Sequence, residues 1–370
     1  MQRLLSGLAT AVLLTATTQA VTVGASHDDG SPHVSVSVVV DHLNNPRGLT
    51  FGPDGGLYVA EGGTGGSDMT TPSDCEQVKA PVGPYSGGYT SRISRVDVRH
   101  HTRTTVADGL PSSQTSPALG NLVSGVADVK FIGRTLYALE AGAGCSHGLL
   151  HTSNELLRVN RDGTTTRVAN LSAYQRRHPV AKPEDDDFEP DGTWFSMIVV
   201  RGMIYAVEPN HGEIVRINPY SGMVTRLADV SASQGHIVPT AIADVGNANL
   251  VFGNLSVFPI VPGSAGLYKV TPSGQVKQRF GGLTTVLGVL PAGWNRLYVL
   301  ESMTAPGFPG PNELGAGRIL HVDPNGKATV VVGGLSFPTA MTMGPDGALY
   351  VSNLGFAGAG AGQIVRVAIR

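Results

Sequence analysis

Six polar side chains recur at equivalent positions, each ending a short apolar strand of the Leu-Tyr-Val type. They are Glu61, Glu140, Glu208, Asn254, Glu301 and Asn353. Carboxylate and amide oxygens are the ligands that a hard cation such as calcium prefers, but they also accept backbone N–H bonds where a strand turns. Four glutamates at one level would repel one another unless a cation or hydrogen-bond donors compensated. The pattern favours the hydrogen-bonding role and leaves the cation role open.

A second polar set opens the strands that should lie nearest the axis of the fold. It comprises Arg47, Ser124, Ser196, Thr240 and Thr339. Small hydroxyl groups suit a wet channel, whereas Arg47 is the one charged member and a candidate anchor for an anion. We therefore predict a ligand site whose mouth is formed by this set. Its outer wall would consist of Glu61, Glu140, Glu208, His211 and Glu301.

The densest run of charge spans residues 184–192 and holds acids at alternating positions. These candidate metal ligands are Asp185, Asp187, Glu189 and Asp191. An EF-hand is excluded, because its closing glutamate would fall on Ile198 and Pro190 interrupts the loop. Two interpretations stay open, a solvated acidic loop and a looser calcium site. No cofactor is certain from the sequence, and calcium is the one that it suggests.

Several other chemistries find no support in the chain. It has no Gly-x-Ser-x-Gly elbow, no His-Glu-x-x-His, no phosphate loop and no Cys-x-x-Cys. With 26 basic and 28 acidic residues, it offers no surface suited to nucleic acid. Two cysteines cannot build a structural zinc site. Cys75 and Cys145 lie in equivalent loops of adjacent repeats, so we predict one disulfide between them.

The elements that position these residues form an internal repeat. Residues 43–61 and 335–353 are identical at ten of nineteen positions without a gap, and both contain a Gly-Pro-Asp-Gly turn between two strands. The second strand of this unit occurs six times, each time followed by a third strand with an apolar pair around a basic or polar residue. Four strands in each of six units predict an all-β, six-bladed β-propeller.

The two ends of the chain should meet in one blade. The sixth unit stops at Arg370 without a fourth strand, while residues 36–43 align with the fourth strand of the fifth unit at 328–335. An N-terminal strand is therefore expected to complete the last blade and to remove two open sheet edges. The expected domain is a single propeller over residues 33–370.

Residues 1–25 have the composition of a secretory signal peptide. Arg3 precedes an apolar run over residues 4–16, and small-residue cleavage sites follow. No other apolar stretch approaches the length of about 18 residues that a membrane span needs. The mature protein is therefore predicted to be secreted, extracellular or periplasmic, without a transmembrane segment.

The repeat resembles the ScyD/ScyE family, named for proteins encoded with the cyanobacterial pigment scytonemin. The resemblance rests on residues 45–63, Asn-Pro-Arg-Gly-Leu through Tyr-Val-Ala-Glu-Gly-Gly, and on the Tyr205–Ile217 unit, and it extends over the mature chain. It implies a secreted, NHL-like six-bladed propeller. It implies no catalytic residues, because none are agreed for the family. Kinship with sugar lactonases, paraoxonase-like hydrolases and a streptogramin lyase is an analogy of fold.

Two functions compete at this point. The first is a module that binds a small molecule or a protein, as yet unknown, through the loop-rich face, the face of the propeller where the long loops between second and third strands gather. The second is a divalent-metal hydrolase, similar to a lactonase, in which a channel-bound calcium would polarise a carbonyl. Such an enzyme needs carboxylates on its inner strands, and these are mainly Leu, Val, Met and Thr, with Asp128 the clearest exception. The shortage favours binding.

Overall fold

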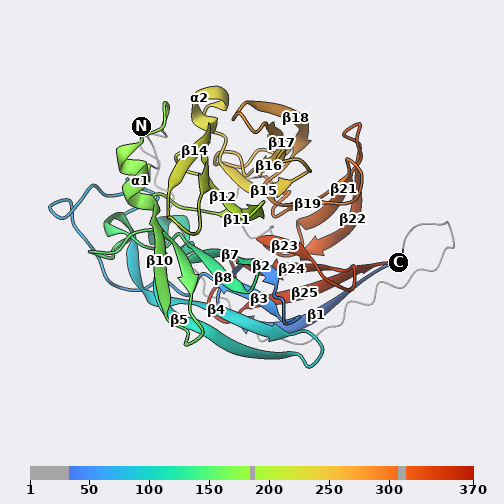
Figure 1. The fold of residues 1–370 in the computed structure, drawn as a ribbon, viewed down its shortest axis with the longest axis horizontal. Coiled ribbons are helices and arrows are strands. Elements are labelled where there is room, and N and C mark those ends of the chain that lie inside the picture. The colour runs from blue at the N-terminus through green and yellow to red at the C-terminus, as the bar shows by residue number, and fades with distance from the viewer. Residues whose placement is uncertain (1–32, 184–187, 307–313) are drawn as a thin grey trace, which may run out of the picture.

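A computed structural model describes residues 33–183, 188–306 and 314–370. The predicted signal peptide and the candidate ligands Asp185 and Asp187 lie outside the described residues. Six antiparallel sheets form a ring, with the first strand of each nearest the centre (Figure 1). The six-bladed β-propeller is thus confirmed. No helix in the described ranges is long and apolar enough to cross a membrane.

Five blades have four strands, and the first blade carries an extra two-residue strand. The first three blades comprise β2 (Pro46–Phe51), β3 (Leu57–Glu61), β4 (Ser86–Asp97), β5 (Thr102–Gln114) and β6 (Val123–Ser124); β7 (Val126–Ile132), β8 (Thr135–Glu140), β9 (Glu155–Val159) and β10 (Thr165–Asn170); and β11 (Ser196–Val200), β12 (Met203–Glu208), β13 (Glu213–Ile217) and β14 (Val224–Asp229).

The remaining blades follow in chain order, and short helices lie in the connections. The strands are β15 (Pro239–Asp244), β16 (Leu250–Asn254), β17 (Ala265–Val270) and β18 (Val276–Leu283); β19 (Val286–Pro291), β20 (Leu297–Glu301), β21 (Gly317–Val322) and β22 (Ala328–Leu335); and β23 (Ala340–Met343), β24 (Leu349–Asn353), β25 (Gly362–Ile369) and β1 (Val34–Leu43). The helices are η1 (Pro117–Leu119), η2 (Cys145–His147), α1 (Leu171–Arg177) and α2 (Val230–Gln234).

The repeated Gly-Pro-Asp-Gly sequence makes a tight turn with a fixed set of contacts. Gly55 has a φ of 75°, which a glycine adopts without steric cost. The Asp54 carboxylate accepts hydrogen bonds from the Arg95 guanidinium at 2.7 Å and from the Tyr58 hydroxyl at 3.3 Å. Asp346 receives the same two kinds of bond in the last blade. The repeat therefore specifies a turn that satisfies its own polar groups, and in the first and last blades it ties the first three strands together.

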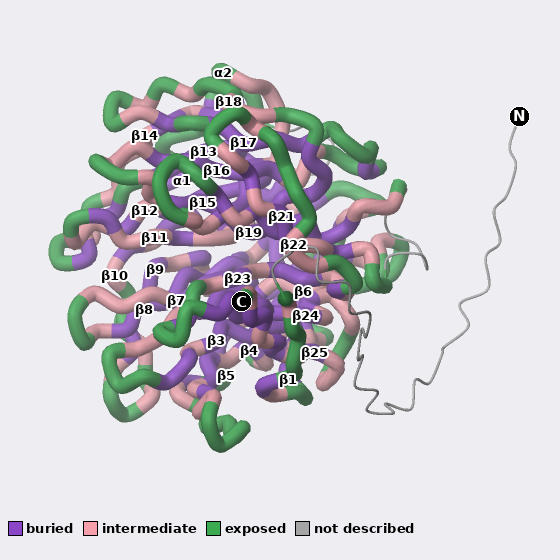
Figure 2. Tube along the Cα trace, turned by 90° about the vertical axis from the view of Figure 1, so that its right-hand side faces the viewer, coloured by how far each residue is buried: buried purple, intermediate pink, exposed green. Residues whose placement is uncertain are grey.

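The core lies between neighbouring blades. Alternate side chains of a strand face the next sheet; Leu57 and Val59, for example, are fully buried. The cluster between the first and second blades joins Ile93 to Val126 and Val129. Figure 2 shows buried segments through the middle of the molecule and exposed ones along the outer loops and turns. Apolar packing between blades thus holds the central strands in place.

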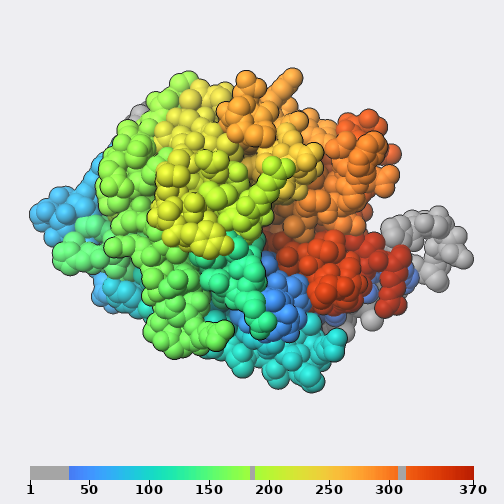
Figure 3. Space-filling view, viewed as in Figure 1, coloured from blue at the N-terminus to red at the C-terminus, as the bar shows by residue number. Residues whose placement is uncertain are grey.

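The ring closes as predicted. Strand β1 pairs antiparallel with β25, from Val34 opposite Ile369 onwards. His33 and Arg370 continue the ladder with two backbone hydrogen bonds of 2.9 and 3.0 Å. The blue N-terminal and red C-terminal segments accordingly lie side by side (Figure 3). Both ends of the described chain complete one sheet.

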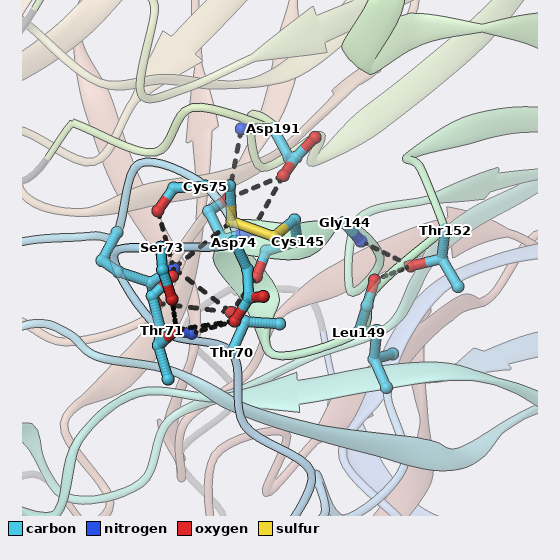
Figure 4. The surroundings of a disulfide bond; sticks show 12 residues. Thr70, Thr71, Ser73, Asp74, Cys75, Gly144, Cys145, Leu149, Thr152 and Asp191 are labelled. Carbon is cyan, nitrogen blue, oxygen red and sulfur yellow. Dashed lines mark hydrogen bonds between the residues drawn. A yellow bond between two sulfur atoms is a disulfide. The ribbon is translucent and has the colours of Figure 1, made fainter.

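The predicted disulfide between Cys75 and Cys145 is present, with the two Cα atoms 6.2 Å apart. It joins the long loop between β3 and β4 to helix η2 of the second blade (Figure 4). The Thr70 hydroxyl adds a hydrogen bond of 2.6 Å to the Cys145 carbonyl. Asp191 accepts bonds from the backbone N–H and hydroxyl of Ser146. Three segments of the loop-rich face are therefore fastened together.

Replacing both cysteines by serine is expected to destabilise the protein by up to roughly 4 kcal/mol. The bond closes a loop with a sequence separation of 70 residues, and loss of that constraint raises the entropy of the unfolded chain. The double variant should melt below the wild type by several degrees, and reduction of the wild type should reproduce the change. Equal melting temperatures for the reduced and oxidised wild-type protein would contradict this expectation.

Candidate functional site

A cavity of about 680 Å³ occupies the centre of the loop-rich face. Each of the six inner strands contributes an apolar side chain to its lining. These residues are Leu49, Ala127, Met197, Ala241, Leu287 and Met341. The volume is within the usual range for sites that enclose a small molecule. These six side chains are held in fixed positions, because each belongs to an inner strand of a closed ring.

The loops add an aromatic collar around this cavity. It consists of Tyr85, Trp194, Phe195, Phe258 and Phe356. Trp194 is almost completely buried, whereas Phe258 is exposed. Aromatic rings in a concave site offer a large apolar contact area with little loss of rotamer freedom. The collar could not be predicted from the sequence, since its members come from loops of different length with no shared motif.

Arg47 is the basic group at the head of β2. Its side chain lines the cavity, although the residue is only 9% exposed. One Nη2–H donates to the Val123 carbonyl at 2.5 Å, and the guanidinium lies 4.5 Å from the centre of the Phe356 ring. Over the described ranges, no carboxylate oxygen lies within 4.0 Å of this guanidinium. Burial lowers the pKa of Arg47 to about 10, so it is charged at neutral pH.

Asp128 is the acidic residue of the inner strands, and protein donors surround it. The Lys130 ammonium donates to it at 2.5 Å, and the backbone N–H groups of Val129 and Met197 donate at 2.8 Å. Burial raises the pKa of Asp128. A Cβ atom on Gly48 would lie 2.0 Å from an Asp128 oxygen, so only glycine fits there. Asp128 therefore connects the first three blades.

The structure brings the five predicted mouth residues together in the cavity lining, but several of their hydroxyls point to protein. Ser196 donates to the Thr240 carbonyl at 2.6 Å, Thr240 donates to the Val286 carbonyl, and Thr339 donates to the Pro46 carbonyl at 2.6 Å. Each of these bonds joins the start of one inner strand to the start of the inner strand in the next blade. Ser124 lies in β6, the extra strand of the first blade, and not at the head of an inner strand as expected, because β7 begins at Val126. Arg47 is the charged member of the set, and it has donors left for a ligand.

The strand-end carboxylates are buried, and they do not line the cavity. Glu61 accepts from the Asn44 N–H at 2.7 Å, and Glu301 accepts from the Thr284 N–H at 2.5 Å. Glu208 accepts from Thr193 and His211, and Glu140 from Ala141 and Gly142. Asn254 and Asn353 also accept backbone N–H bonds. The strand-end residues therefore accept backbone N–H bonds where their strands turn, as the first of the two interpretations of this set requires.

The four strand-end glutamates differ in whether a basic side chain lies near the carboxylate. Glu61 lies 3.6 Å from Arg103, and Glu301 pairs with Arg318. In the described part of the chain, Glu140 and Glu208 have no basic side chain within 4.0 Å. Burial without a cation raises the pKa of both carboxyls to about 8, although backbone N–H bonds act in the opposite direction. These two groups therefore titrate near neutral pH.

The described end of the acidic segment is anchored to the loop-rich face. Glu189 accepts from the Tyr85 hydroxyl at 2.8 Å, and Asp191 accepts from Arg176 at 2.6 Å. The predicted wall residue His211 is buried, and its Nε2 donates to the Glu189 carbonyl at 2.9 Å. His147 bonds to Gly192 in the same way. Within the described ranges, no three His, Cys, Asp or Glu side chains are grouped as metal ligands.

Comparison with solved structures supports the architecture. A PQQ-bound aldose sugar dehydrogenase from Streptomyces coelicolor superposes with a TM-score of 0.53 at 13% identity, covering 91% of this chain and 99% of that one. A gluconolactonase from Xanthomonas campestris gives 0.51 at 10% identity, covering 91% and 90%. At such identities the likeness shows the six-bladed propeller fold alone. No protein-family model matches the chain. No curated protein matches its sequence either.

Proposed function

We propose that the protein is a ligand-binding module that takes a small molecule into the cavity on its loop-rich face. The observation that carries the proposal is the cavity itself, about 680 Å³ in volume and lined by six inner strands and an aromatic collar. Apolar concave sites with a few polar groups are typical of small-molecule binding. The rigid closed ring supports this role, because a preformed site loses little entropy when it binds.

The lactonase-like alternative needs oxygen ligands for a cation at the channel. The acidic residues in the described lining are Asp128 and Glu189. Asp128 accepts from Lys130 and two backbone groups, and Glu189 accepts from Tyr85. Asp191 is likewise engaged by Ser146 and Arg176. These oxygens as placed do not fit a calcium shell, so binding is the function that the geometry favours.

Secretion and kinship with the ScyD/ScyE family belong to the same proposal. The support for secretion is the composition of residues 1–25 together with the disulfide, which is typical of oxidising compartments. The support for kinship is the repeat sequence. An N-terminal sequence of the exported protein tests the first point, since a mature chain that begins at Met1 would contradict it.

Filling the cavity should abolish uptake of an apolar probe. Ala340 lines the cavity from β23 and is only partly buried. In Ala340→Trp, the indole should occupy the space of a ligand and weaken binding of the neutral fluorophore N-phenyl-1-naphthylamine by at least about tenfold, the equivalent of some 1.4 kcal/mol. Fluorescence titration gives the affinity.

Val330→Trp is the matched control. Val330 lies on the outer strand β22 and is 60% exposed. This variant should bind the probe like the wild type. Unchanged binding by Ala340→Trp, or no binding by the wild type, would contradict a binding role for the cavity.

A further inference from the structure

We propose that the cavity recognises an amphipathic anion, a ligand with an apolar body and one terminal anionic group, and that Arg47 binds the anionic group. The inference rests on the proposed function, because it assigns a ligand class to the same cavity. Three independent features of the molecule support it. They are the setting of Arg47, the charges of the lining, and the apolar character of the remaining walls.

Arg47 is buried, yet only part of its hydrogen-bonding capacity is used. A guanidinium has five N–H donors in a planar fork. Within the described residues, its side-chain hydrogen bond is the one from Nη2 to the Val123 carbonyl. That bond and the ring of Phe356 hold the group from two sides. The guanidinium is therefore pre-oriented, and its remaining donors match the oxygens of a carboxylate, sulfonate or phosphate.

The other charged groups of the lining already have counterparts. Lys130 donates to Asp128 at 2.5 Å. Glu189 accepts from Tyr85, and its second oxygen lies 3.6 Å from His147 Nε2. No carboxylate in the described ranges lies within 4.0 Å of Arg47. A buried cation without an acidic partner is unfavourable, and an anionic ligand would remove that penalty in a way that a neutral ligand would not.

The rest of the ligand must be apolar. Beyond Arg47, the cavity continues along Leu49, Ala127, Met197 and Leu287 and is surrounded by the aromatic collar. Hydroxyls of Ser196, Thr240 and Thr339 donate to backbone carbonyls of the ring, so they offer little to a sugar. A polyhydroxylated ligand would leave its own hydroxyl groups unsatisfied on these walls. One anionic head and an aromatic or aliphatic body fit the arrangement.

A matched pair of probes tests the assignment. 8-Anilinonaphthalene-1-sulfonate carries the same aromatic body as N-phenyl-1-naphthylamine plus one sulfonate. The wild type should bind the sulfonate probe more tightly. Arg47→Met should weaken binding of the sulfonate probe by about 10- to 100-fold, the range for a hydrogen bond to a charged group, and should leave binding of the neutral probe within about twofold.

Two further variants serve as controls. Arg47→Lys keeps the charge and should retain part of the preference for the sulfonate probe. Arg216→Met removes an exposed arginine on β13 and should change neither affinity. Melting temperatures establish that each variant is folded.

The outcomes separate the two proposals. If neither probe binds the wild type, or if Ala340→Trp binds both probes as tightly as the wild type does, the binding function itself fails. If both probes bind and Arg47→Met affects neither, the cavity binds ligands but the anion assignment is wrong. Equal loss of both probes in Arg47→Met would also overturn the assignment, because Arg47 would then shape the cavity without recognising charge.

Discussion

A protein lacking residues 33–40 is expected to melt roughly 5 to 10 °C below the full-length chain. The deletion removes most of the ladder between β1 and β25 and the buried side chain of Val39. Each lost hydrogen bond costs about 1 kcal/mol, and burial of Val39 contributes roughly 2 kcal/mol more. Dividing the summed loss of free energy by the unfolding entropy, about 2.1 cal/mol/K per residue, gives a fall in melting temperature of roughly 5 to 10 °C.

Substitutions within β1 should separate edge pairing from side-chain effects. Val36 and Val38 are 45% and 51% exposed, so threonine at both positions should leave the melting temperature nearly unchanged. Val39→Asp places a charge in the core and should approach the effect of the deletion. Differential scanning calorimetry measures all three variants. A truncated protein as stable as the wild type would show that the first strand does not secure the ring.

Stability should fall as the pH rises from about 6.5 to 8, and Glu140 should account for part of the fall. Its pKa is raised from 4.5 to about 8 by burial, so the folded state holds the proton more tightly than the unfolded state. The resulting stabilisation is complete below pH 4.5 and is lost as the pH rises through about 8. Linkage gives roughly 2 kcal/mol over the interval from 6.5 to 8.

Glu140→Gln and Glu208→Gln form a matched pair for this effect. At Glu140 both N–H donors reach Oε1, and Oε2 has no hydrogen-bond partner, so an amide should replace the neutral carboxyl with little strain. At Glu208 the Thr193 N–H reaches Oε1 and the His211 N–H reaches Oε2. In Glu208→Gln the amide NH2 would face one of these backbone N–H groups, and the free energy of unfolding should fall by about 1 to 3 kcal/mol at every pH.

Thermal melts between pH 6.5 and 9 distinguish these cases. Glu140→Gln should already be more stable than the wild type at pH 6.5, because the glutamate of the unfolded wild type is ionised there, and its advantage should grow up to about pH 8 because its slope is smaller. The window also avoids the acid side, where His147, whose pKa is lowered by burial, would make stability fall with decreasing pH. A wild-type slope preserved in Glu140→Gln would mean that this carboxyl does not titrate in the window.

The repeat made the architecture predictable, because each unit satisfies its own local chemistry. The Leu-Tyr-Val type of strand and the third strand that pairs with it recur in all six blades, and the Asp54 turn with its contact to Arg95 recurs in the last blade at Asp346. Closure by β1 followed from the same alignment. The additional strand β6 and the lengthened β4 and β5 did not, since they arise from loops that occur once.

The candidate site was predictable only where symmetry placed it. Arg47 and the other predicted mouth residues all line the cavity, and those at the inner ends of β2, β11, β15 and β23 do so because they stand at equivalent positions. The burial of Glu140 and Glu208 was not visible, because the N–H donors around them depend on loop conformation. The same holds for the aromatic collar. Periodicity reports which strand a residue belongs to, whereas the direction of a side chain at a strand end depends on the loop that follows.

Closure of the ring by the two chain ends has a consequence for the order of assembly. Val34 leaves the ribosome early, but its partner Ile369 is made almost last. At 5 to 20 residues per second, the interval is roughly 20 to 70 s. Throughout that time β1 is an unpaired edge with alternating valines, a template for pairing with another chain. The loops of Cys75 and Cys145 lie in the first two blades, so they can come together without any part of the sixth blade, whereas closure by β1 must wait for β25.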